Sequence, residues 1–347
     1  MNVRKYQVIL QAAQPIAHHS ETLGNHQMLM RRKVRQPDGR FVEVPYVTGD
    51  TMRHGLREAA AYASLDAAGI LDRANLSAGA LNLLFAGGSI TGSSGPSVSI
   101  TGHRAMVDAF PPLAILGGCA GNRTIPGRLD VGNADLICAE TAHLLPAWVV
   151  EIAGGHVCEL DGDCCVRADG LAGHRAHVEE HQRVRMDPML NPGKRHLLTD
   201  EARTAVEGRM LSHEEASAAG DVQGKADSKS SMMPRTFEGI VAGSLFFWQC
   251  SVTTHSGLDV DTWHVMLGAF LANCKVGGKR GVGFGELRPV AGGTRGFDWR
   301  RPAESAEALN PFELPAPEGA DRVGALFRRH MAERANRFRE FLDKVVA

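Results

Sequence analysis

Residues 277–287 read GGKRGVGFGEL, a glycine-rich loop that carries two adjacent cations, Lys279 and Arg280. Glycine at every second position removes side chains and permits positive φ, so a polymer can approach the backbone closely. Backbone N–H groups and the two cations would then face phosphates. The spacing is neither a Walker phosphate loop nor a dinucleotide fingerprint, because no Gly-Lys-Ser/Thr follows and the loop precedes a predicted strand. A tight glycine hairpin with a purely structural purpose is the alternative.

The composition describes a globular chain with many turns. Its 347 residues are 44% hydrophobic, enough for a substantial core in two domains or in one domain with large insertions. The formal charge is −1, so nucleic-acid binding would need a locally basic surface. The 39 glycines and 6% aromatic residues favour turns and irregular loops around a modest core.

Targeting signals are not evident in the sequence. No apolar run reaches the roughly 20 residues of a membrane span, and residues 1–11 lack the hydrophobic region and cleavage site of a signal peptide. We therefore expect a cytoplasmic protein with no membrane partner. The seven cysteines show no framework spacing, and the adjacent Cys164 and Cys165 are poorly placed to pair, so reduced thiols are expected.

A turn that leads into a helix is the second informative segment. Residues 47–57 read VTGDTMRHGLR and precede an alanine-rich run, Glu58 to Leu65, with strong helix propensity. Asp50 or Thr51 is the expected N-cap. The N-terminus of a helix suits a phosphate, and Arg53 and Arg57 lie four residues apart on one face.

The remaining pattern predicts a mixed α/β chain. Residues 6–10, 41–44 and 240–253 predict strands, and Pro37-Asp38-Gly39 predicts a hairpin turn. Residues 127–134 predict a turn, a strand and a turn. Residues 211–231 predict a protruding polar insertion. Residues 263–272 predict an apolar helix and 321–345 an amphipathic one with a basic outer face.

Four segments in this order resemble the RAMP superfamily, the repeat-associated CRISPR proteins. They are the turn and helix at Val47–Arg57, the segment Leu116–Ala134 with Gly127-Arg128-Leu129, the region Gln182–Gly243 entered by Arg183-Val184-Arg185-Met186-Asp187, and the glycine-rich loop. Together they span nearly the whole chain. Within the superfamily the chain is most similar to the Cas-seven backbone subunits, and among these to the type IV group.

The resemblance implies a fold class and a set of partners. The fold would be α+β, one RAMP-type domain over residues 1–347 with an RRM-like (ferredoxin-like) palm. It would carry a helical and loop insertion at 66–112, a β-hairpin-like thumb at 186–236 and a C-terminal amphipathic helix at 318–347. The protein would bind guide RNA (crRNA), oligomerise along it as a filament, join other CRISPR effector subunits and present the guide for pairing with a target nucleic acid. No cofactor is implied.

The expected RNA contacts come from the same segments. Met232 and Met233 could wedge against a displaced base, and the alternative is that they anchor the thumb in a buried position. Arg31, Arg32 and Lys33 form the densest basic run, and the alternative is an exposed strand face. The predicted RNA-binding residues are Arg31, Arg32, Lys33, Thr51, Arg53, Arg57, Met232, Met233, Arg235, Gly278, Lys279, Arg280 and Gly281.

Catalysis is not expected. Type III relatives cut target RNA with an aspartate after the first strand, but residues 14–36 contain no Asp. His18 and His19 could share acid and base roles there, as in a target-RNA endoribonuclease, although a polar loop with chance histidines is the simpler interpretation. His54 is the only candidate for a guide-processing endoribonuclease, and its place in the phosphate-facing turn favours binding.

A metal site is also not expected. His174, His177 and His181 would share one face of a helix, with Cys158, Cys164 and Cys165 nearby in sequence. Zinc accepts such ligands, but the sequence has no Cys-x-x-Cys pair there and no evident fourth ligand.

Overall fold

The computed structural model divides the chain into two compact units. Unit 1 comprises Met1–His19, Leu29–Glu179 and Gly239–Ala347, and unit 2 comprises Ser20–Met28 and Glu180–Glu238. The structure describes residues 2–73, 76–88, 100–120, 123–160, 163–167, 170–184, 199–201, 204, 234–298, 307–310, 314, 316, 317 and 319–344.

Unit 1 is built on an antiparallel sheet whose four central strands follow a β-α-β-β-α-β order. The elements are β1 (Asn2–Ala12), α1 (Gly49–Ala67), β8 (Leu129–Leu136), β13 (Leu245–Thr254), α7 (Gly257–Ala272) and β15 (Glu286–Asp298). Across the sheet the strands lie in the order β15-β1-β13-β8, with β1 antiparallel to both neighbours and β13 antiparallel to β8. This is the RRM-like, ferredoxin-like arrangement that the family resemblance implied.

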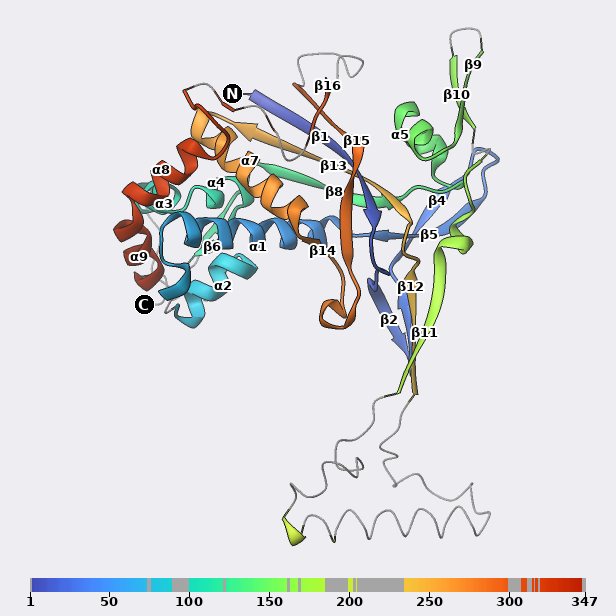
Figure 1. Ribbon diagram of the computed structural model, residues 1–347, viewed down its shortest axis with the longest axis horizontal. Coiled ribbons are helices and arrows are strands. Elements are labelled where there is room, and N and C mark those ends of the chain that lie inside the picture. The colour runs from blue at the N-terminus through green and yellow to red at the C-terminus, as the bar shows by residue number, and fades with distance from the viewer. Residues whose placement is uncertain are drawn as a thin grey trace. The chain divides into compact units, whose positions relative to one another are not determined.

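Strand alternation determines which residues face each layer. Val8 and Leu10 of β1 join the main core beneath α1 and α7, whereas Ile9 points to the opposite face and packs with Val149 and Phe247. The opposite face is covered there by α5 (Ala147–Ile152). Helices α1 and α7 pack against each other over the sheet, as Figure 1 shows.

A hairpin extends the sheet beyond β8. It consists of β4 (Arg31–Arg35) and β5 (Phe41–Val47), and β5 pairs with β8. The predicted turn is confirmed: the Gly39 N–H donates to the Gln36 carbonyl at 2.9 Å, and Gly39 has φ +88°. Two short strands, β14 (Cys274–Lys275) and β16 (Glu307–Ala308), pair with β15 at the other edge.

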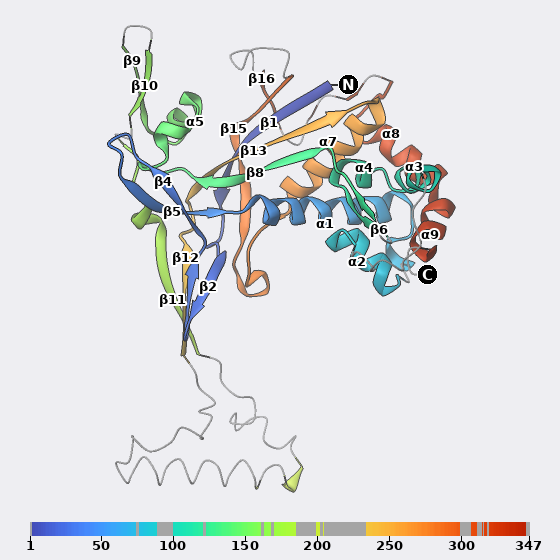
Figure 2. The same cartoon turned by 180° about the vertical axis from the view of Figure 1, so that it is seen from behind.

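Helices gather at the end of unit 1 away from this hairpin, as both Figure 1 and Figure 2 show. The predicted C-terminal helix is instead two helices, which meet at Arg334. Phe327, Met331, Phe338 and Leu342 still face the core, as the periodicity predicted. The helical elements here are η1 (Leu71–Arg73), α2 (Ala78–Ala86), α3 (Ile100–Ala109), α4 (Pro112–Leu116), α8 (Ala325–Glu333) and α9 (Ala335–Lys344).

Two further predictions about strands were wrong. Residues 132–134 were expected to form a turn but lie inside β8, where a Cβ on Gly132 would come 2.9 Å from the Gln249 carbonyl oxygen. The glycine therefore allows β8 and β13 to approach closely, and it does not reverse the chain. The strand expected at 240–253 is interrupted, because β12 ends at Ile240 and β13 begins at Leu245.

Arg128 fixes the connection that enters β8. Its guanidinium forms a bidentate ion pair with Asp259, at 2.7 and 3.0 Å, and its Nε donates to the Ala114 carbonyl at 3.0 Å. Asp259 stands in the first turn of α7, whose N-cap is Ser256. The Gly-Arg-Leu motif at 127–129 therefore has a structural role in joining α4, β8 and α7.

The other elements of unit 1 are short. Two hairpins occur, one of β6 (Gly118–Ala120) and β7 (Arg123–Ile125), the other of β9 (His156–Leu160) and β10 (Asp163–Arg167). Unit 1 also contains the 3₁₀ turns η2 (Ala142–Leu144) and η3 (His174–His177).

Unit 2 contains a small sheet in the order β11-β12-β3-β2. The strands are β2 (His19–Leu23), β3 (His26–Leu29), β11 (Val178–Val184) and β12 (Pro234–Ile240). β11 and β12 flank the predicted thumb, most of which lies outside the described residues. Nowhere in the described ranges is there a helix with the length and apolar character of a membrane span.

Candidate nucleic-acid interface

The glycine-rich loop is held against the chain that follows β1. The Gly278 N–H donates to the Ala17 carbonyl at 2.7 Å, and the Gly285 N–H donates to the Pro15 carbonyl at 2.8 Å. Between these points the loop makes a 3₁₀ turn, η6 (Arg280–Val282), preceded by Lys279 at φ +59°. Within the described ranges Lys279 is the only residue other than glycine with a positive φ.

The glycines of this loop have two different roles. Gly277 (φ +72°) has no room for a side chain, because its Cβ would lie 2.5 Å from the Ala17 carbonyl oxygen, and Gly285 (φ +89°) is closed off by the Val276 carbonyl oxygen. Gly281 and Gly283 border open space. The structural interpretation therefore holds for the two ends of the loop, while the exposed middle remains accessible to a ligand.

The first turn of α1 lies beside this loop. Its N-cap is Thr48 rather than the predicted Asp50 or Thr51, and the Thr51 N–H donates to the Thr48 hydroxyl at 3.4 Å. The Gly49 N–H donates to the Asn133 side-chain oxygen at 2.8 Å. Asn133 thereby fixes the start of the helix from β8.

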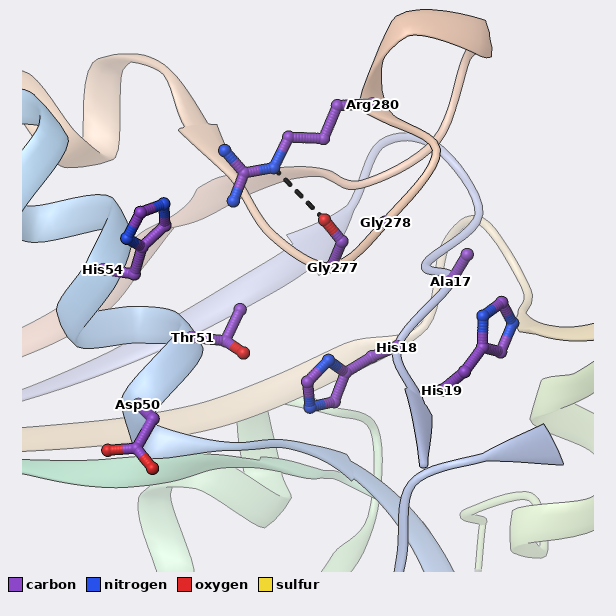
Figure 3. A pocket seen from close by; sticks show the side chains of 9 residues that line it. All are labelled: Ala17, His18, His19, Asp50, Thr51, His54, Gly277, Gly278 and Arg280. Carbon is purple, nitrogen blue, oxygen red and sulfur yellow. Dashed lines mark hydrogen bonds between the residues drawn. The ribbon is translucent and has the colours of Figure 1, made fainter. Parts of the chain in front are cut away.

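These two segments line one open pocket of about 570 Å³. Figure 3 shows His18, Thr51, His54 and Arg280 arranged around it from three separate parts of the chain. The lining residues are Ala17, His18, His19, Asp50, Thr51, His54, Gly277, Gly278 and Arg280. All of them belong to unit 1.

His18 is fixed in one tautomer. Its Nε2 accepts a hydrogen bond from the Thr48 N–H at 3.3 Å, so the proton of the neutral ring resides on Nδ1. Burial, and secondarily the neighbouring His19, lower the pKa of His18 below its ordinary value. The ring is therefore neutral at pH 7 and offers a donor rather than a base.

Arg280 carries the positive charge of the pocket on a fixed guanidinium. Its Nε donates to the Gly277 carbonyl at 3.2 Å, and its Nη1 lies 3.2 Å from Glu58 Oε2. The arginine and glutamate side chains are 29% and 38% exposed, so solvent screens the pair and the arginine can also contact a ligand. Asp50, at the rim, adds a negative charge near the start of α1.

Arg53 and Arg57, both predicted as phosphate contacts, bind backbone carbonyls inside unit 1. Arg53 donates to the Leu116 and Leu129 carbonyls at 2.7 and 3.2 Å, and Arg57 donates to the Gly117 carbonyl at 3.1 Å. Arg57 is only 8% exposed. Its burial, together with Arg53, lowers the pKa of Arg57 to about 10. The burial of Arg57 does not fit a phosphate contact, whereas for the half-buried Arg53 that contact stays a prediction.

The basic run on β4 is split between two faces of the hairpin. Arg32 forms an ion pair with Asp135 at 3.0 Å and lies 5.9 Å from the centre of the Tyr46 ring. Lys33 is exposed on the opposite face. Arg31 is half-buried and Lys33 is exposed, so their contact with RNA stays a prediction, whereas Arg32 supports the sheet.

The remaining predicted residues are divided between the two units. Thr51, Gly278 and Arg280 line the pocket, and Lys279 and Gly281 belong to the same loop. Arg235 is exposed on β12 and is the predicted contact that belongs to unit 2 within the described residues. Met232 and Met233 lie outside the described residues.

The histidines considered as metal ligands have other partners. His174 Nδ1 lies 2.8 Å from Glu140 Oε1, and His177 Nδ1 lies 2.9 Å from the Ser244 hydroxyl. In unit 2, His181 stacks on Phe237 with ring centres 5.1 Å apart. The segment is a 3₁₀ turn followed by a strand, so the helical face on which the metal hypothesis depended does not form.

The fold and the pocket together define an RRM-like palm with a phosphate-compatible pocket beside its first helix. No family model matches the chain, and no curated protein matches it either. Among solved structures it is similar to a chain described as "Type IV-B CRISPR Complex", with 15% identity and a TM-score of 0.47 over 88% of this chain and 94% of that chain.

Six pocket residues were missing from the predicted RNA contacts: Ala17, His18, His19, Asp50, His54 and Gly277; of these the three histidines were weighed only as catalytic groups. Glu58, the charge partner of Arg280, was also not predicted. His54 could have been found, because it lies one turn beyond Thr51 on the same helix. Nothing local indicates that Glu58 meets a residue 222 positions later in the chain.

Replacing Gly277 with Ala tests whether the loop anchor is a structural requirement. We expect Gly277→Ala to lower the free energy of unfolding by about 2 kcal/mol, because positive φ and the Ala17 carbonyl both oppose a Cβ. Gly281→Ala is the matched control and should leave stability nearly unchanged. Urea titration followed by circular dichroism measures both; equal effects would contradict the assignment.

His18 predicts a specific dependence of stability on pH. Because its folded-state pKa is depressed, its contribution is complete above the unfolded value of about 6.5 and is lost as pH falls through the folded value. His18→Gln retains an acceptor for the Thr48 N–H but does not titrate. The stability difference between wild type and His18→Gln should therefore change between pH 7.5 and 5, and a constant difference would contradict the prediction. His177, also depressed, is present in both proteins and cancels.

Proposed function

We propose that this chain is a non-catalytic guide-RNA-binding backbone subunit of a CRISPR ribonucleoprotein, most like those of type IV. The observation that carries the proposal is the pocket in which Arg280, His18 and the start of α1 converge. Four ordered sequence segments resembling the RAMP superfamily, and the RRM-like strand order, support the same assignment.

The pocket suits a sugar–phosphate backbone rather than a base edge. The His18 Nδ1–H and the Arg280 guanidinium are donors, and phosphate oxygens are acceptors. The Thr51 hydroxyl shares a hydrogen bond with the Thr48 hydroxyl at 3.0 Å. Backbone contacts of this kind position a strand without reading its sequence. A guide held in this way leaves sequence recognition to base pairing.

Further copies of the chain and other subunits of the complex are the proposed protein partners. A pocket that binds backbone without sequence preference can be repeated along one guide, with one copy for each segment of RNA. The proposed assembly is therefore a filament of identical subunits in the cytoplasm. The length of the guide would set the number of copies.

Removal of the Arg280 charge tests the proposal directly. Arg280→Gln should weaken binding of single-stranded RNA and reduce the slope of log K against log salt by about 0.7, the contribution of one phosphate contact. Glu58→Gln should strengthen binding, because it removes the anion that competes for Arg280. Fluorescence anisotropy over a salt series measures both.

Arg329→Gln is the matched control for this experiment, since Arg329 is exposed on α8 and lies outside the pocket. It should leave affinity and salt slope nearly unchanged. If Arg280→Gln and Arg329→Gln behave alike, the pocket is not the RNA site and the proposal fails.

An endoribonuclease is the second candidate, favoured by the presence of His18, His19 and His54 around one pocket. General base catalysis needs an unprotonated ring nitrogen facing the reacting hydroxyl, and the only unprotonated nitrogen of neutral His18 is already bonded to Thr48. This argues against His18 as the general base and leaves His54 as the histidine to test.

The assembled complex should accordingly leave both guide and matched RNA intact over hours. Denaturing gel analysis of end-labelled RNA measures this, with His54→Ala as the comparison. Cleavage by the wild-type complex that disappears in His54→Ala would establish the enzyme and refute the non-catalytic assignment.

A further inference from the structure

One face of the β4–β5 hairpin combines cations with an exposed aromatic ring. Antiparallel register places Arg35 opposite Phe41 and Lys33 opposite Glu43, so these four side chains share one face. Burial agrees, since all four are exposed while Val34 and Val44 on the other face are buried. We call these four residues, Lys33, Arg35, Phe41 and Glu43, the outer hairpin face.

Phe41 has no evident packing role. It is 67% exposed, although phenylalanine usually lies in the core, whereas its chain neighbour Val42 packs against the main core from the other face. An exposed aromatic ring on a sheet is the surface on which RRM and related proteins stack unpaired bases. Stacking is insensitive to base identity because every base has a π-face.

The charges of the outer hairpin face are available to a polyanion. Among the described residues neither Lys33 nor Arg35 has an ion pair within 4.0 Å, and Glu43 is the only anion on the face. Arg32, by contrast, is engaged with Asp135 on the other side of the hairpin. The excess of cations beside a ring favours nucleic acid over an apolar protein surface.

Strand β5 leads from the outer hairpin face to the start of α1, which lines the pocket. β5 runs from Phe41 to Val47, and the next residue, Thr48, is the N-cap of α1 at the pocket. Seven residues of extended strand span about 20 Å. A single strand of several nucleotides can therefore reach from one to the other.

We propose that the outer hairpin face stacks an unpaired base of the same single strand whose backbone occupies the pocket. Phe41 provides the stacking surface, and Lys33 and Arg35 contact the flanking phosphates. The ligand class is single-stranded nucleic acid without sequence preference. This inference rests on the proposed function, because it assumes that the backbone of the same RNA strand occupies the pocket.

The test compares oligouridylates of about 4 and about 16 nucleotides, which bracket the site sizes of single-strand binding folds. Phe41→Leu keeps an apolar side chain but removes the ring, and should weaken binding of the long oligonucleotide about tenfold while leaving the short one unchanged. Phe41→Trp should restore full affinity. Tyr62→Leu is the control, since Tyr62 is an exposed aromatic residue on α1, 49% exposed.

The two cations have an independent readout. The double variant Lys33→Gln, Arg35→Gln should lower the salt slope for the long oligonucleotide by about 1.4, the contribution of two contacts to a single strand. Arg40→Gln is its control, because Arg40 lies in the same hairpin but is paired with Asp38 at 2.6 Å.

The outcomes separate this inference from the proposed function. If Arg280→Gln weakens both oligonucleotides but Phe41→Leu weakens neither, the stacking site is refuted and the pocket assignment stands. If Phe41→Leu alters self-association in sedimentation and leaves RNA affinity unchanged, the face is a protein contact and the inference is also refuted. If wild type binds neither oligonucleotide, both proposals fail.

Discussion

The bridge between Ala17 and Gly278 is the constraint on which the site depends. It joins the segment after the first strand of the palm to the loop before its last strand, and it requires a glycine at 277 because the Ala17 carbonyl fills the space of a Cβ. With the loop pinned there, Arg280 reaches Glu58 on α1 and His18 lies against the start of the same helix. Three distant segments are thereby brought to one pocket.

The same geometry explains why cations of equal charge have unequal functions. Arg53 and Arg57 bind backbone carbonyls inside unit 1, and Arg128 holds Asp259, so their charge is used to fix loops. Arg280 and Lys33 retain a solvent-facing side. The near-zero net charge of the chain is therefore compatible with a local nucleic-acid surface, since the surface depends on a few exposed cations rather than on a basic composition.

Local patterns predicted the first strand, the hairpin turn and the helices of the palm, because strand alternation, turn residues and helix propensity are short-range properties. The strand order of the palm was implied by the family resemblance. They failed where long-range contacts decide. Gly132 and Asn133 resemble a turn, yet Gly132 meets Gln249 on the neighbouring strand and Asn133 binds Gly49 at the start of α1. Arg57 has the spacing of a phosphate ligand, but residues 116–117 supply its partners. The loop and the first turn of α1 were found from sequence; their convergence with His18 depended on the fold.

The central claim is that single-stranded RNA runs through the pocket between the glycine-rich loop and α1. Electron cryo-microscopy of the protein purified with its bound nucleic acid tests this most directly. The account predicts a filament with repeated copies of the palm and continuous RNA backbone density beside Arg280 and His54 in each copy. Particles without repeated subunits, or RNA density that leaves this pocket empty, would contradict it.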